Sequence, residues 1–160
     1  MSAVVCTDYT GYAEVDESKI SVLTEVAVPT CGPNEVLIKV SASSVNPIDW
    51  KIVSGALKAF MPMTFPATIG FEAAGIVGEV GGGGTGLSKG DSVWTDATRG
   101  CYAQFVAVAA EKVGLAPSNL SPEQSAVVPL AGLTSLQALR LLGCQGRPPN
   151  PNPNLRVLIL

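Results

Sequence analysis

The chain has 160 residues, of which 14% are charged and 47% hydrophobic, with a net charge of −3 and no histidine. This length is enough for one domain with a core and the beginning of a second. The small negative charge without a cluster of Lys and Arg argues against a nucleic-acid-binding protein, and the interrupted apolar stretches are too short for a membrane span of ~20 residues.

The predicted elements begin with three short strands, covering residues 3–6, 19–28 and 35–43. Turn signals separate them, and hydrophobic residues alternate with others along the third. The first part of the chain is therefore expected to be rich in β-structure.

A polar turn follows the third predicted strand. The Asn46-Pro47 pair biases Asn46 away from helical geometry, and Asp49, Trp50 and Lys51 follow within six positions. These polar groups could converge on one small carbonyl compound. Local sequence alone also allows another interpretation, in which Asp49 caps a short helix that begins at Trp50 and Trp50 belongs to the core.

Two further strands are predicted in the middle of the chain, over residues 70–80 and 100–108. Between them, four consecutive glycines at 81–84 resemble a phosphate-binding loop. Such a loop must open onto the start of a helix, whereas residues 87–94 have the pattern of a turn and a strand. The glycine run is therefore predicted to be a flexible β-turn.

Helix signals appear only near the C-terminus. Ser121, Pro122 and Gln124 form a capping-box pattern that starts one helix, and leucines at helical spacing predict a second, buried helix from Pro129 to Leu142. A Pro- and Asn-rich linker at 146–153 and an apolar strand at 154–160 follow. A strand in this place is how a nucleotide-binding βαβ unit begins.

The cysteines and the missing histidine restrict the chemistry. The four cysteines are scattered without a CxxC pair, and the N-terminus lacks the features of a secretory signal. Reduced thiols in the cytoplasm are expected, with an organellar stroma or matrix left open. The absence of histidine removes the usual general base and the commonest metal ligand. The cysteines are Cys6, Cys31, Cys101 and Cys144.

Five ordered motifs resemble the N-terminal, GroES-like catalytic domain of the medium-chain dehydrogenase/reductase superfamily, in its zinc-free quinone oxidoreductase and alkenal/enone reductase branch. The motifs lie at residues 32–40, 46–51, 70–75, 90–93 and 130–134. The resemblance implies a mainly β fold with some α-helix: a partly open GroES-like β-barrel, two C-terminal helices and the first strand of a truncated Rossmann domain. The expected divisions are a catalytic domain at 1–145, a linker at 146–153, and a strand at 154–160 from a nucleotide-binding domain that is otherwise absent.

The resemblance also bears on zinc. Zinc-dependent relatives carry a cysteine, a histidine and a cysteine as ligands where this chain has Asn46, Phe71 and Leu130. The four closely spaced cysteines of their structural zinc lobe are missing too. A chain of this kind is expected to bind no zinc and to transfer hydride from a reduced nicotinamide.

The resemblance assigns roles to six residues. Asn46 and Lys51 are the expected catalytic residues, because donors near the substrate oxygen stabilise its developing negative charge. Lys51 stands where many quinone oxidoreductases carry a tyrosine; a solvated lysine or one paired with Asp49 is the alternative. Asp49, Trp50 and Phe71 are expected to bind substrate, and Asn46 and Thr134 to contact the cofactor.

The resulting hypothesis is a zinc-independent, NAD(P)H-dependent oxidoreductase acting on quinones or α,β-unsaturated carbonyl compounds, with NADPH as the expected cofactor. Its expected partners are the small-molecule substrate, the missing nucleotide-binding domain and, in a homodimer, a second copy. The chain by itself is expected to be inactive. The alternative is a non-enzymatic GroES-like subunit or assembly module that lacks the cofactor domain.

Overall fold

An antiparallel sheet of five strands forms the centre of the computed structural model, which describes residues 1–14, 16–97 and 99–142. The long strands β3 (Glu35–Ser43) and β5 (Glu72–Val80) pair along most of their length. They lie in the middle of the order β7-β3-β5-β6-β8. The outer strands are β6 (Ser92–Asp96), β7 (Phe105–Ala109) and β8 (Val113–Leu115).

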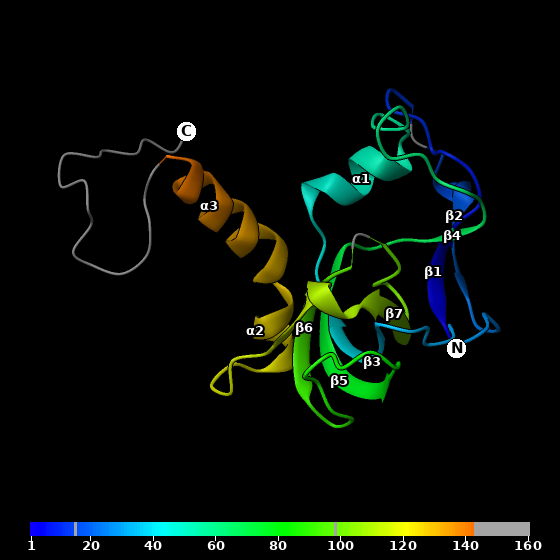
Figure 1. Cartoon of the computed structure of the whole chain (residues 1–160). Coiled ribbons are helices and arrows are strands. Elements are labelled where there is room, and N and C mark those ends of the chain that lie inside the picture. The colour runs from blue at the N-terminus through cyan, green and yellow to red at the C-terminus, as the bar shows by residue number, and fades with distance from the viewer. Residues whose placement is uncertain (15, 98, 143–160) are drawn as a thin grey trace.

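One face of this sheet supplies the core. Side chains at alternate positions of a strand point to the same face, so Val36 and Ile38 of β3 meet Val106 and Val108 of β7 on that side. Val77 and Val93 complete the same buried cluster from β5 and β6. Figure 1 shows that this sheet is curled, and these six side chains form its buried core.

A second sheet of three strands lies beside the first (Figure 1). It has the order β2-β1-β4, with β1 (Ala3–Cys6) between β2 (Ile20–Leu23) and β4 (Ala67–Thr68). The 3-10 helix η1 (Glu17–Lys19) leads into β2, and a second one, η2 (Ala110–Lys112), joins β7 to β8.

Three α-helices complete the described part of the chain. Helix α1 (Pro47–Val53) lies above one end of the five-stranded sheet in Figure 1. Helix α2 (Pro122–Ala126) packs against this sheet at β5 and β3. Helix α3 (Pro129–Leu141) extends away from the sheet (Figure 1). No helix within these described residues is long and apolar enough to cross a bilayer.

The predicted capping box at Ser121 is confirmed: its hydroxyl accepts from Gln124 N–H, and Gln124 Oε1 accepts from Ser121 N–H. The predicted burial of the second helix is wrong. Leu133 and Leu136 of α3 are each 43% exposed, because α3 extends away from the sheet and residues 131–142 are all exposed (Figure 1). Helical spacing of leucines indicates that one face of the helix is apolar, but it does not indicate which segment packs against that face.

Several predicted boundaries also change. The predicted strand at 100–108 begins only at Phe105, because Cys101 and Tyr102 instead donate backbone hydrogen bonds to the carbonyl oxygens of Gly70 and Ile69, in the segment before β5. The strand expected at 19–28 ends at Leu23. The first α-helix begins at Pro47 with Asn46 as its N-cap, not at Trp50 behind an Asp49 cap. The linker at 146–153 and the strand at 154–160 lie outside the described residues.

Gly75 provides a test of the packing between β3 and β5. A β-carbon at this buried position would overlap the backbone carbonyl of Lys39, beside the irregularity in strand pairing at Val40 and Ala42. We expect Gly75→Ala to lower the free energy of unfolding by about 1–3 kcal/mol, the usual cost of overpacking. Urea denaturation followed by circular dichroism measures this.

The matched control is Gly78→Ala on the same strand, where the added carbon would lie 3.5 Å from the Leu37 carbonyl oxygen, an ordinary contact. Equal losses of stability in the two variants would contradict the explanation by close approach at Gly75.

Candidate active site

A buried carboxylate joins three elements at one end of the sheet. Glu72, the first residue of β5, is only 1% exposed. Its Oε1 accepts hydrogen bonds from the Ser44 hydroxyl and, at 2.7 Å, from Nδ2 of Asn46, while its Oε2 accepts from the backbone N–H of Leu130 at 2.6 Å. We call Glu72, Ser44, Asn46 and the Leu130 amide the Glu72 cluster. It ties β5 to the turn before α1 and to the start of α3.

Asn46 owes its position to the residue that follows it. Pro47 restricts Asn46 to extended backbone geometry, observed as φ −123°, which suits an N-cap. The Asp49 side chain returns to the cap, where Oδ2 accepts from Asn46 N–H at 2.7 Å. Two of the predicted site residues are thereby held together, and the polar turn fixes the start of α1.

Asp49 is nearly buried, at 6% exposure. Its Oδ2 also accepts from the Tyr102 hydroxyl at 3.0 Å, and that hydroxyl lies 3.1 Å from the Ser44 carbonyl oxygen. Its Oδ1 has no hydrogen-bond partner among the described residues. Burial raises the pKa of Asp49, and the hydrogen bonds from Asn46 and Tyr102 oppose this rise.

Tyr102 reaches Asp49 because Gly70 leaves room for its ring. A β-carbon on Gly70 would overlap that ring, and the φ of +97° at Gly70 is one that glycine adopts without strain. Burial, and then the hydrogen bond to Asp49, raises the pKa of Tyr102, so its hydroxyl keeps its proton. Tyr102 thus acts as a neutral donor in this site.

Trp50 and Lys51 lie on the outer side of α1. Trp50 is 49% exposed and stacks on Tyr12 with ring centroids 5.5 Å apart, so the interpretation of Trp50 as a core residue is wrong. Lys51 is exposed, and its Nζ is 5.8 Å from the centroid of the Trp50 ring, within cation–π range. The exposed side of α1, together with Tyr12 from a neighbouring loop, therefore offers two aromatic rings and one ammonium.

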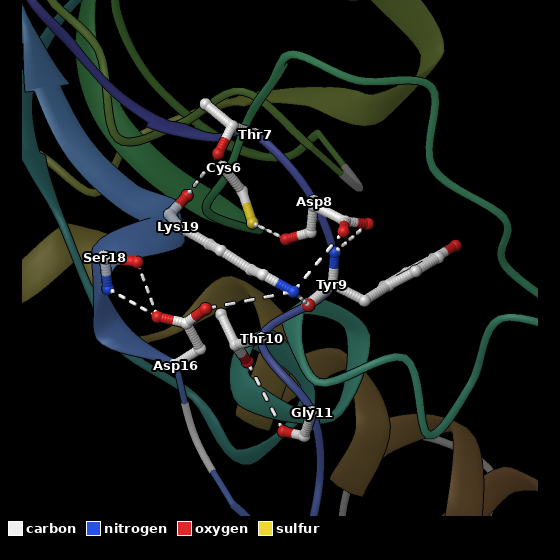
Figure 2. A network of polar contacts seen from close by, with 9 residues as sticks. All are labelled: Cys6, Thr7, Asp8, Tyr9, Thr10, Gly11, Asp16, Ser18 and Lys19. Carbon is white, nitrogen blue, oxygen red and sulfur yellow. Dashed lines mark hydrogen bonds and ion pairs between the residues drawn. The ribbon is translucent and has the colours of Figure 1, made fainter.

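The loop that carries Tyr12 is held by Lys19. Figure 2 shows the Lys19 ammonium donating to the Tyr9 carbonyl oxygen at 2.8 Å and pairing with Asp8 and Asp16 at 3.3 and 4.0 Å. This network closes the segment between β1 and β2. It lies on the protein surface, so each pair contributes little to stability, but it orders the backbone beside Tyr12.

The other two predicted residues lie in different surroundings. Phe71 is buried and lines, with Asp49, a cavity of about 10 Å³. Thr134 is exposed on α3. Asn46 and Asp49 are hydrogen-bonded at the start of α1, and Asp49 and Phe71 line one cavity, whereas Trp50 and Lys51 are exposed on α1. Thr134 is connected to them only through the start of α3, where Leu130 meets Glu72.

Sequence reasoning missed Glu72, Ser44 and Tyr102. A usable signal existed for Glu72, the only charged residue between Ile69 and Gly78. A carboxylate inside such an apolar strand must find donors, since burial without them is costly. The roles of Ser44 and Tyr102 depend on contacts over 28 and 53 residues, which no local pattern reveals.

Two further observations bear on ligands. Among the described residues, no three His, Cys, Asp or Glu side chains are grouped closely enough to hold a metal ion. A largely apolar cavity of about 560 Å³ lies between α3 and the β6–β8 side of the sheet, bordered by Trp94, Val113, Leu133 and Leu136 among others. None of the six predicted site residues lines it.

Comparison with known proteins assigns the fold and the family. Residues 32–118 match the alcohol dehydrogenase GroES-like domain. The chain belongs to this family and is a GroES-like domain of the medium-chain dehydrogenase/reductase superfamily, which confirms the predicted fold class and superfamily. The relatives that it matches include proteins named quinone oxidoreductase.

The chloroplast envelope quinone oxidoreductase homolog of Arabidopsis thaliana is 42% identical over 119 residues, covering 72% of this chain and 36% of the relative. The 2-methylene-furan-3-one reductase of Solanum lycopersicum is 36% identical over 144 residues, covering 84% and 36%. Escherichia coli quinone oxidoreductase complexed with NADPH superposes with a TM-score of 0.76 at 29% identity, covering 88% of this chain and 40% of that one. The chain thus spans 36–40% of the length of these relatives.

The raised pKa of Asp49 predicts a pH dependence of stability. The folded chain holds the Asp49 proton more tightly than the unfolded chain, so stability falls as pH rises from about 3.9, the ordinary aspartate value, to the pKa in the folded state. We expect Asp49→Asn to remove this slope. As pH rises through this window, the parent should lose stability relative to the variant. The relative loss should be about 1.4 kcal/mol for each unit by which folding raises the pKa of Asp49.

Urea denaturation at intervals between pH 3.5 and 7 measures that difference. Tyr102→Phe should extend the upper end of this window to higher pH, because it removes a donor that favours the Asp49 carboxylate in the folded chain. A difference between Asp49→Asn and the parent that is independent of pH would show that Asp49 ionises normally, and the opposite slope would show that folding lowers its pKa; either result would contradict this prediction.

Proposed function

We propose that this chain is the catalytic domain of a zinc-independent, NADPH-dependent reductase of quinones or α,β-unsaturated carbonyl compounds. The names of the relatives support this reaction class, since 2-methylene-furan-3-one is itself an unsaturated ketone. The observation that carries the proposal is the Glu72 cluster. Asn46 and Leu130, which occupy two positions of zinc ligands in the metal-dependent relatives, both donate to the Glu72 carboxylate.

This arrangement supports chemistry without zinc. The third ligand position is Phe71, whose ring is a poor metal ligand, and Glu72 already accepts three hydrogen bonds. The proposed site therefore works through hydrogen bonding and charge. NADPH, when bound, would supply the hydride.

The residues present fit the nicotinamide end of such a cofactor. Asn46 offers an amide and Thr134 an exposed hydroxyl, and neutral polar groups of this kind suit a carboxamide and ribose hydroxyls. The phosphates would be bound by a nucleotide-binding domain, which we propose from the greater length of the relatives. The exposed leucines of α3 are a surface that such a domain could cover.

Lys51 is proposed to stabilise the substrate oxygen. As hydride reaches the electron-poor carbon, an electron pair moves onto the carbonyl oxygen, and a nearby ammonium lowers the energy of that charge. Trp50 and Tyr12 provide flat apolar surfaces beside Lys51, suited to planar substrates. Activity in the cytoplasm or in an organellar stroma or matrix, and assembly as a homodimer, remain predictions.

Replacement of Lys51 tests this assignment in a polypeptide that joins this chain to its nucleotide-binding domain. We expect Lys51→Met to lower kcat on the order of 10²-fold, with a smaller change in KM, because the ammonium acts mainly in the transition state. Steady-state oxidation of NADPH with a quinone and with an enone measures both constants.

Lys58→Met is the matched control, since Lys58 is also an exposed lysine and lies just beyond α1. An unchanged kcat in Lys51→Met on both substrates would remove Lys51 from the site. If the parent polypeptide oxidises NADPH with neither substrate class, the non-enzymatic module becomes the better explanation.

A further inference from the structure

The segment between β1 and β2 is docked on α1. The backbone N–H of Thr10, a residue that is only 4% exposed, donates to the carbonyl oxygen of Val53 in the last turn of α1 at 2.9 Å. The ring of Tyr9 packs against Gly55 just beyond the helix, where an added β-carbon would lie 3.1 Å from Cγ of that ring. Residues 9–12, which we call the Tyr12 loop, are therefore fixed to α1.

The Tyr12 loop in turn supports the Trp50 ring. Figure 2 shows the backbone of the loop tied down by the Lys19 ammonium, which donates to the Tyr9 carbonyl oxygen. Tyr12 follows three positions later, and its ring stacks on that of Trp50 with an angle of 30° between the planes. Because loop and helix are already joined at Val53, this stack limits the freedom of the Trp50 ring.

The Trp50 ring contacts the ammonium of Lys51. Neighbouring residues of an α-helix point about 100° apart, so the lysine stem must bend back toward the indole to bring Nζ to 5.8 Å from the ring centroid. An ammonium over an aromatic ring is attracted by the negative face of that ring. Within the described part of the chain, Lys51 forms no ion pair, with Asp49 or with any other carboxylate. The indole is therefore the group that holds this ammonium.

We propose that Trp50 is a positioning residue for Lys51: the Tyr12 loop holds the indole through the stacked tyrosine, and the indole holds the Lys51 ammonium beside α1. This inference rests on the proposed function for the role of Lys51. A lysine has a flexible four-carbon stem, so an unrestrained ammonium would spend only part of its time at the substrate oxygen. The aromatic pair thus has a role that requires no contact with the substrate.

The first measurement needs no activity. In the NMR spectrum of the 160-residue chain, the ε-methylene protons of Lys51 should be shifted upfield by the nearby Trp50 ring, so Trp50→Leu should move them downfield. Tyr12→Ala should move them in the same direction by a smaller amount. The same protons of Lys58, an exposed lysine beyond α1, are the control and should not move. Lys51 signals that Trp50→Leu leaves unchanged would overturn the proposal.

The second measurement is kinetic and uses the polypeptide that includes the nucleotide-binding domain. Trp50→Leu should lower kcat about two- to fivefold, the factor that corresponds to one exposed cation–π contact. Trp50→Phe keeps an aromatic face and should retain more of kcat than Trp50→Leu does. Phe60→Leu is the matched control, since Phe60 is an aromatic residue beyond α1 that is 86% exposed, and it should leave kcat unchanged.

Combination with Lys51→Met separates positioning from direct contact with the substrate. If Trp50 acts through Lys51, Trp50→Leu should cause no further loss of kcat in a polypeptide that already carries Lys51→Met. An equal loss in both backgrounds, an unchanged kcat in Trp50→Leu, or a rise in KM alone would overturn the proposal. A parent polypeptide that oxidises NADPH with neither substrate class would overturn the proposed function, and the NMR measurement would still decide whether Trp50 holds Lys51.

Discussion

Burial of the Glu72 carboxylate is the constraint on which the site depends. An ionised carboxylate removed from water is costly unless donors replace its hydration, and no lysine or arginine of the described residues forms an ion pair with it. Three donors replace that hydration: a hydroxyl, an amide side chain and a backbone N–H at the start of α3. Because these come from separate segments, satisfying one carboxylate brings the turn, the strand and the helix to one place.

A second buried acid gives the site a layered organisation. Asp49 lies behind Asn46 and binds its backbone N–H, while Tyr102 supports Asp49 from the turn before β7. Tyr102 can approach because Gly70 carries no side chain. Asn46 is thus held through its side chain by Glu72 and through its backbone by Asp49. Such double support limits the freedom of a residue that would otherwise belong to a mobile turn.

The sequence was informative where structure is determined by neighbours along the chain. The strand at 3–6, the capping box at Ser121 and the long strand at 35–43 all follow from local patterns, and the structure has them at the expected residues. The surroundings of Trp50 and α3 did not follow. Whether a large apolar residue is covered depends on distant segments. Tyr12 reaches Trp50 across 38 positions, and Leu133 and Leu136 of α3 stay 43% exposed although they border a cavity with Trp94 and Val113 of the sheet.

The position of Trp50, stacked on Tyr12, allows ligand binding at α1 to be followed by intrinsic tryptophan fluorescence. The chain has two tryptophans, and only Trp50 is stacked on another ring beside a proposed substrate-binding lysine; Trp94 lies on β6. Indole emission responds to contact with electron-poor rings and to the polarity around it. A planar quinone that displaced water from Trp50 would quench part of the emission at long wavelength, so occupancy of the outer surface of α1 can be followed without a label.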